Sequence, residues 1–210
     1  MFPLDRIELG PHSYGVRPNT YGVVLHTTEY PSSSLEHGLQ CAHDQSPGGS
    51  LFAGGGSYHF ILTDDGPILT VPFLEAAGGI SGDHTPPSQI SPITGRPGTW
   101  APERFPWLRQ MLAPEAYADP NLYLLQIAIS GRTAELDTYE NVVALAADAA
   151  AILLWAEGLE EIVDNVVVMG HLNWQTDRSD PGQWFIDLVM SEYAALAGAK
   201  PVNIRVGNTA

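Results

Sequence analysis

The sequence predicts an α/β fold in which a mixed central β-sheet is flanked by helices. Short apolar runs rich in β-branched residues recur along the chain, bounded by glycine, proline or polar residues. Two longer segments, after residues 137 and 180, carry the apolar pattern of helices. One pair of strand-like runs surrounds a short turn containing glycine, which indicates an antiparallel hairpin within the sheet.

Each predicted strand is a short run dominated by apolar residues. These runs lie at residues 21–25, 58–62, 68–71, 122–129 and 166–169. The turn at residues 64–66 joins the second run to the third. Two of the buried strands end at a histidine, His26 after the first and His171 after the last.

Three helices are predicted from their capping and stop signals. The first covers residues 35–43 and is capped by Ser34, the second runs from a capping box at Asp137 and Glu140 to residue 155, and the third begins at Pro181. The segments 47–49 and 54–56 are glycine-rich and predict loops.

Residues 78–120 are rich in proline, glycine and serine, with one short helix expected near residues 103–111. A long irregular segment in a compact domain is typical of a lid or a binding loop. The length of 210 residues suits one domain, which we place at residues 1–197. Residues 198–210 show no pattern and are expected to form a tail or linker.

The composition excludes several classes of function. The net charge of −15 argues against a nucleic-acid partner and against docking on anionic lipid. The first residues lack the basic start and apolar run of a secretory signal, and no segment is long and apolar enough to span a bilayer. We expect a monomer in the cytoplasm of the producing cell, without a membrane partner.

Cys41 is the only cysteine, so an intramolecular disulfide and a zinc site built from several thiolates are both excluded. Any metal would be held by histidines and carboxylates. His26 and His171 stand at strand ends, and Asp180 follows His171 by nine residues. Two histidines and one carboxylate would leave a position open on a catalytic zinc ion. Taken singly, each histidine is also compatible with a polar residue at a strand end, and Asp180 with a helix cap.

The ordered motifs resemble a known family. They are residues 24–29 around His26, residues 57–61 followed by Asp65 and Gly66, residues 127–131, and Gly170-His171 followed by residues 178–182. Spanning about residues 21 to 196, this set is similar to the N-acetylmuramoyl-L-alanine amidases of the phage-lysozyme and peptidoglycan-recognition-protein superfamily (amidase type 2), and suggests the catalytic domain of a phage endolysin.

This resemblance implies that His26, His171 and Asp180 bind Zn²⁺. It also implies a peptidoglycan substrate, cleaved at the amide between N-acetylmuramic acid and L-alanine after the protein is released from the producing cell. Tyr58 matches the family's active-site tyrosine, which can donate a hydrogen bond or shuttle a proton. Arg178 stands where many relatives have lysine, and since it cannot give up a proton, we expect a purely electrostatic role. A strand tyrosine and a solvated arginine are the structural alternatives.

The general base is left open. Some relatives carry a catalytic glutamate where this chain has Ala128, so either Tyr58 or another acid such as Glu29 must serve. His84 is a candidate for substrate contact, with an exposed loop residue as the alternative. Trp174 is a second candidate, with packing as its alternative.

Two other functions remain open. The chain could be a binding module that holds muropeptides without cutting them, although such modules typically lack the third metal ligand. It could also be a zinc amidase that recycles free muropeptides in the cytoplasm.

His59 alternates with Tyr58 along the strand and is expected to be structural.

Overall fold

The computed structural model describes residues 6–8, 13–45, 56–80, 83–158, 162–198 and 205–206. The strands are β1 (Arg6–Ile7), β2 (Ser13–Val16), β3 (Thr20–Thr27), β4 (Phe60–Thr63), β5 (Gly66–Leu69), β6 (Glu75–Ala77), β7 (Leu124–Ile129), β8 (Ile162–Gly170) and β9 (Arg205–Val206). Seven of them form one sheet in the order β1-β5-β4-β7-β3-β8-β9, and β2 pairs with β6 separately. Among the described strands of the large sheet, only the β4–β5 hairpin is antiparallel. The predicted mixed sheet is confirmed.

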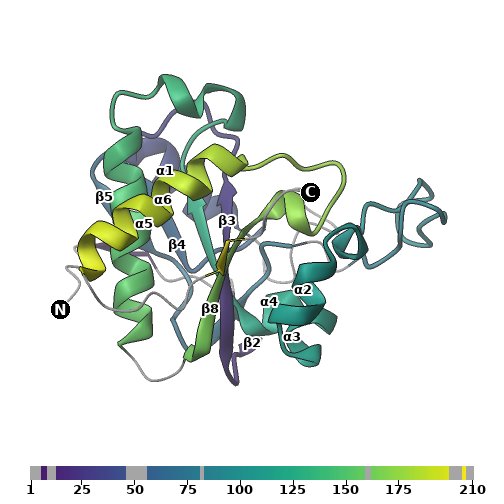
Figure 1. The fold of residues 1–210 in the computed structure, drawn as a ribbon. Coiled ribbons are helices and arrows are strands. Elements are labelled where there is room, and N and C mark those ends of the chain that lie inside the picture. Colours follow the sequence, from purple (N-terminus) through teal and green to yellow (C-terminus); the bar gives the residue numbers. More distant parts are fainter. Residues whose placement is uncertain are drawn as a thin grey trace.

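Helices cover both faces of this sheet (Figure 1). They are α1 (Leu35–Asp44), α2 (Pro106–Met111), α3 (Pro114–Ala118), α4 (Pro120–Tyr123), α5 (Val142–Glu157) and α6 (Gln183–Ala197). The helices α5 and α6 pack on one face, against alternate strand residues such as Val23, Leu25 and Ile127. The residues between them, such as Val24 and Ala128, face the opposite layer. That layer contains α1 and the segment from α2 to α4.

Much of the described part of segment 78–120 packs on the sheet as a layer, called here the 78–120 layer, and this part differs from the lid or binding loop expected from its composition. Residues 87–97 are exposed apart from Ser91, as a surface loop would be. Leu108, Leu112 and Ala116 are buried against Val24 and residues of the neighbouring strands. The predicted helix near residues 103–111 is present as a 3-10 turn followed by α2, while α3 and α4 were not predicted. The segment is irregular because prolines interrupt it repeatedly, yet its apolar residues still bury one face of the sheet.

The helix starts were predicted with mixed success. Ser34 caps α1 as expected, with its side chain accepting a hydrogen bond from the His37 N–H. The capping box at Asp137 was wrong, because residues 133–138 form a 3-10 turn and α5 begins after Asn141. The last helix begins after Gly182, so Pro181 precedes the helix instead of opening it.

Part of the predicted tail is ordered against the sheet. Arg205–Val206 form β9, which pairs in parallel with β8. The division into a domain at residues 1–197 and a tail at 198–210 stays a prediction. The predicted loops at 47–49 and 54–55 lie outside the described residues.

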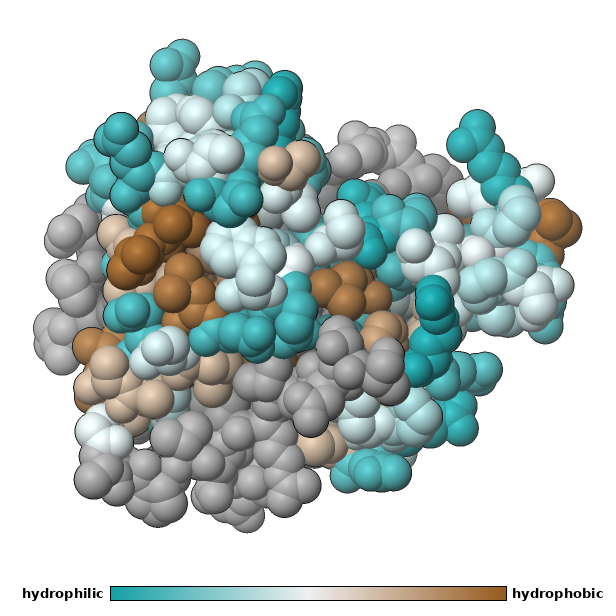
Figure 2. All heavy atoms as spheres, turned by 45° about the horizontal axis from the view of Figure 1, so that its top comes forward, coloured by the Kyte–Doolittle hydropathy of each residue, from teal (hydrophilic) through white to brown (hydrophobic). Residues whose placement is uncertain are grey.

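Among the described helices, none combines the length and the apolarity that a bilayer crossing requires. The face drawn in Figure 2 is mainly hydrophilic or neutral, and its hydrophobic residues form separate patches.

His59 directly precedes β4, and its side chain forms hydrogen bonds to β6 and β7. Its side chain is fully buried; Nε2 donates to the Glu75 carbonyl (2.7 Å), and Nδ1 accepts the Gln126 N–H (2.9 Å). Burial lowers the pKa of His59 well below its ordinary value, and the nearby positive charge of Arg17 acts in the same direction. His59 is therefore a neutral structural residue, as its alternation with Tyr58 suggested.

We expect the metal-free protein to lose stability as the pH falls below about 6.5, the ordinary pKa of histidine. Because the folded-state pKa of His59 is depressed, the unfolded chain takes up a proton that the folded chain rejects. The loss should approach about 1.4 kcal/mol per pH unit for such a histidine. Urea unfolding at pH 7.5 and pH 5.5, in the presence of a chelator, measures it. His59→Gln should reduce this pH dependence.

An NMR titration of the wild-type histidines provides a check that does not depend on the variant folding. The ring of His59 should remain neutral at pH 5.5. If the ring protonates near its ordinary pKa while the protein is folded, or if His59→Gln folds and shows an unchanged pH dependence, the assignment is wrong.

Candidate metal centre

His26 occupies the next-to-last position of β3. Its side chain lies on the same face of the sheet as that of Val24, opposite α5 and α6, and it is fully buried. The strands β7 and β8 pair in parallel on either side of β3, so the ends of all three lie at the same sheet edge. A rigid central strand therefore positions the His26 imidazole.

His171 and Asp180 reach the same edge from the end of β8. His171 is the first residue of a 3-10 turn that follows the strand directly, and Asp180 lies in the loop before α6. The Leu172 N–H donates to the Asp180 carbonyl, and the Thr27 N–H donates to Asp180 Oδ2 (3.2 Å). Both side chains are buried. The loop is thus tied back onto the end of β3 beside His26.

The three side chains converge through one atom each. His26 Nδ1 lies 3.1 Å from His171 Nδ1, while Asp180 Oδ2 lies 3.3 Å from His171 Nδ1 and 3.8 Å from His26 Nδ1. All three atoms fall within 4.8 Å of one another, an arrangement that could hold a metal ion. The structure therefore brings together the three residues that the sequence analysis predicted as ligands.

The electrostatics favour the forms of these groups that bind metals. Burial, and next the charge of His171, lower the pKa of His26 to about 3, so its ring is neutral near pH 7. Burial acts to raise the pKa of Asp180, but the two histidines and the Thr27 N–H outweigh it and hold the pKa below its ordinary value. A neutral imidazole and an ionised carboxylate are the states that coordinate a cation. Two nitrogens and one oxygen fit zinc and leave room for a further ligand.

Tyr58 lies beside the three converging residues. Its ring centroid is 5.2 Å from that of His26, and the side chain is half-buried next to Cys41 and Ala128. Burial, and after it the nearby negative groups, raise the pKa of Tyr58 far above its ordinary value. The phenol therefore stays protonated and can donate a hydrogen bond, but it does not act as a base.

A cavity of about 370 Å³ opens next to Asp180. Its lining residues are Glu29, Thr133, Ala134, Asp177, Arg178, Ser179 and Asp180. Arg178 is exposed here, and its charge lowers the pKa of both His26 and Tyr58, so it acts on the site electrostatically. The electrostatic role expected of Arg178 in catalysis stays a prediction.

Glu29 is held firmly at the wall of this cavity. Its backbone adopts a left-handed conformation, with φ of 61°, which is uncommon for a residue other than glycine. Its Oε1 accepts hydrogen bonds from the Thr27 hydroxyl (2.7 Å), the Thr133 hydroxyl (2.7 Å) and the Thr133 N–H (3.2 Å). Such fixed geometry at a sparsely populated backbone angle is a frequent feature of functional sites.

The two predicted substrate contacts lie elsewhere. Trp174 is fully buried, and its Nε1 donates to Met169 Sδ, so the packing alternative is the one its position supports. His84 is exposed and stacks on Trp100, with centroids 3.9 Å apart, but it does not line the cavity beside Asp180. Substrate contact by His84 remains a prediction.

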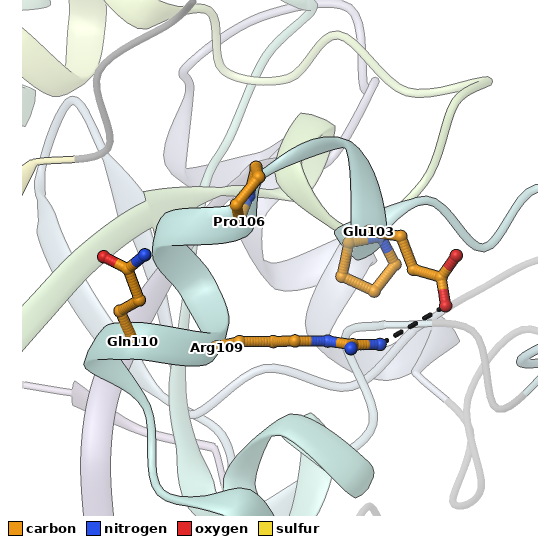
Figure 3. A pocket seen from close by; sticks show the side chains of 5 residues that line it. Glu103, Pro106, Arg109 and Gln110 are labelled. Carbon is orange, nitrogen blue, oxygen red and sulfur yellow. Dashed lines mark hydrogen bonds and ion pairs between the residues drawn. The ribbon is translucent and has the colours of Figure 1, made fainter.

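A second cavity, of about 450 Å³, lies in the 78–120 layer. Its lining residues are Pro102, Glu103, Pro106, Arg109 and Gln110. Figure 3 shows the Arg109 side chain extended toward Glu103, with which it pairs at 3.3 Å. The three converging residues lie outside this lining, so this cavity is separate from the candidate metal centre.

Gln126 and Gln175 were not predicted from the sequence. Each places its side-chain oxygen against the Nε2 of one candidate ligand, at 2.6 Å from His26 and 2.5 Å from His171. One signal was available, since Gln126 is a polar residue in the otherwise apolar run 124–129. Gln175 follows His171 by four residues in a loop, where no periodicity points to it.

Comparison with known proteins supports the fold. The sequence matches no protein-family model and no curated protein. Among solved structures, a point mutant of PlyL superposes with a TM-score of 0.50 at 15% identity, over 89% of this chain and 98% of that one. A further PlyL structure gives a TM-score of 0.48 at 14% identity, over 89% of this chain and 95% of that one. The chain therefore shares the fold of PlyL over nearly its whole length.

Proposed function

We propose that this chain is a zinc-dependent N-acetylmuramoyl-L-alanine amidase that hydrolyses the amide between N-acetylmuramic acid and L-alanine in bacterial peptidoglycan. The observation that carries the proposal is the convergence of His26 Nδ1, His171 Nδ1 and Asp180 Oδ2, buried within 4.8 Å of one another and next to a cavity. The fold shared with PlyL and the ordered motifs of the amidase family support the same assignment.

His26, His171 and Asp180 would hold the metal. When bound there, zinc supplies a Lewis acid for the amide carbonyl and lowers the pKa of water toward neutrality. His171, His26 and the Thr27 N–H hold the pKa of Asp180 below its ordinary value, and burial keeps His26 neutral. The chain itself therefore maintains the charge state that a divalent ion requires.

Tyr58 and Arg178 would stabilise the negative charge that develops on the amide oxygen. Tyr58 remains protonated and can donate a hydrogen bond to that oxygen. Arg178 lines the cavity and contributes a fixed positive charge, since its guanidinium does not give up a proton. Neither residue accepts the proton of the attacking water.

Glu29 would be the general base. Ala128, which lies in register with His26 on the neighbouring strand, carries no acidic group. With Tyr58 protonated, Glu29 is the anchored carboxylate of the cavity that is not itself a proposed metal ligand. Its hydrogen bonds to Thr27 and Thr133 fix its position, as proton transfer requires.

We also propose that the protein acts on the cell wall after release from the producing cell.

Digestion of purified peptidoglycan tests the activity. The zinc-loaded protein should release stem peptides with a free L-alanine amino terminus and leave intact sugar chains, as measured by mass spectrometry. Chelation should stop the release. His26→Ala and Asp180→Ala should lose both the bound zinc and the activity, whereas His43→Ala, on an exposed turn of α1, should lose neither. Cosedimentation with peptidoglycan but no cleavage by the zinc-loaded protein would indicate a binding module instead.

The role of Tyr58 is tested by Tyr58→Phe. The variant should retain zinc, because the phenol is not a proposed ligand, but turnover should fall by about 10- to 1000-fold with the loss of one donor to the developing oxyanion. Tyr30→Phe is the matched control, since Tyr30 belongs to the same cluster and donates instead to Asp44. Equal turnover of Tyr58→Phe and Tyr30→Phe would exclude Tyr58 from the mechanism.

A further inference from the structure

Each histidine of the candidate metal centre is held at its second ring nitrogen by a glutamine. His26 Nε2 lies 2.6 Å from Gln126 Oε1, and His171 Nε2 lies 2.5 Å from Gln175 Oε1. Both glutamines are buried: Gln126 is fully inaccessible and Gln175 is 5% exposed. Two separate segments, β7 and the loop after β8, thus present the same kind of acceptor to the two rings.

A carbonyl oxygen can only accept a hydrogen bond, so each contact requires a proton on Nε2 of the histidine. A neutral imidazole carries one ring proton, and the other nitrogen, Nδ1, is then left with a lone pair. The two Nδ1 atoms lie 3.1 Å apart and both face the carboxylate of Asp180. Two lone pairs this close repel unless a proton or a metal ion lies between them. The glutamine contacts therefore select the tautomer in which both Nδ1 atoms are available to a metal ion.

The orientation of the Gln175 amide is fixed independently of His171. Its Nε2 donates to Thr99 Oγ1 (3.0 Å), which leaves Oε1 to face the histidine. Residues 99 and 100 belong to the 78–120 layer, and Trp100 forms a β-bridge with Gln175. The 78–120 layer thus supports the ring of His171 through one amide group.

Gln126 is fixed by its backbone and by close packing. Its N–H donates to His59 Nδ1 (2.9 Å), and a Cβ added to Gly79 would lie 2.7 Å from Gln126 Oε1 and 2.9 Å from His26 Nε2. The Gln126 Nε2 has no hydrogen-bond partner among the described residues. Burying such a group is unfavourable, so packing alone would favour an apolar residue here. The oxygen that contacts His26 is the part of this side chain with a partner.

We propose that Gln126 and Gln175 are positioning residues that hold His26 and His171 as Nε2–H tautomers, so that both Nδ1 atoms face one metal ion. The inference rests on the zinc site of the proposed function and names the residues that prepare it. Partners of this kind orient a ligand histidine and raise its basicity.

Zinc affinity of the purified protein, measured by competition with a chromophoric chelator, tests the proposal. Gln126→Met and Gln175→Met preserve size but remove the acceptor, and each should weaken zinc binding by about 10- to 100-fold. Gln126→Glu restores a stronger acceptor and should bind zinc at least as tightly as the wild type. Gly79→Ala keeps the glutamine at position 126 but should also weaken zinc binding, because the added Cβ would lie 2.7 Å from Gln126 Oε1 and 2.9 Å from His26 Nε2. Thr63→Val, which removes a buried hydroxyl in the β4–β5 hairpin, is the control for general destabilisation and should leave the affinity unchanged.

The opposite ranking would overturn the proposal. If the glutamines only fill space, the Met variants should bind zinc like the wild type, and the buried charge of Gln126→Glu should be the most harmful change. Histidine ¹⁵N NMR of the zinc-loaded wild type provides a second readout: protons should be found on Nε2 of His26 and His171, and protons on Nδ1 would contradict the assignment. A wild-type protein that binds no zinc would refute the proposed function as well, whereas zinc binding that is indifferent to both glutamines would refute this inference alone.

Discussion

The candidate site depends on one electrostatic constraint, which is that two imidazole nitrogens and a carboxylate oxygen occupy a small buried volume. His26 Nδ1, His171 Nδ1 and Asp180 Oδ2 lie 3.1 to 3.8 Å apart. Water is largely excluded from these side chains, so their mutual interactions are weakly screened. A divalent cation at their centre would neutralise the carboxylate and satisfy both nitrogens together. The surrounding fold holds these three atoms close together.

Each layer of the protein contributes to that placement. The parallel pairing of β3 with β8 brings the ends of two strands together, although their histidines are 145 residues apart in the sequence. The Thr27 N–H ties the Asp180 loop to β3, and α6 begins shortly after this loop. On the opposite face, the 78–120 layer reaches His171 through the Thr99 hydroxyl and Gln175. The scaffold is therefore held on several sides, as a preorganised metal site requires.

The parts of this arrangement that depend on local patterns could be predicted from the sequence. Apolar runs located the main strands, and strand-end histidines followed by an aspartate identified the three converging residues, with the family resemblance deciding between a ligand set and ordinary polar residues. The 78–120 layer was not predicted, because its burial depends on spacing between short helices that prolines interrupt. Gln126 and Gln175 were missed because a buried glutamine leaves no periodic signal and its partner is set by tertiary contact. For Trp174 the sequence left substrate contact and packing equally open, and its complete burial supports packing.

The most direct test of the central claim is a crystal structure of the zinc-loaded protein with anomalous data at the zinc absorption edge. We expect one strong peak at about 2.0–2.2 Å from His26 Nδ1, His171 Nδ1 and an Asp180 carboxylate oxygen. A zinc ion bound through the Nε2 atoms, or bound at another place while these three side chains remain without metal, would contradict it.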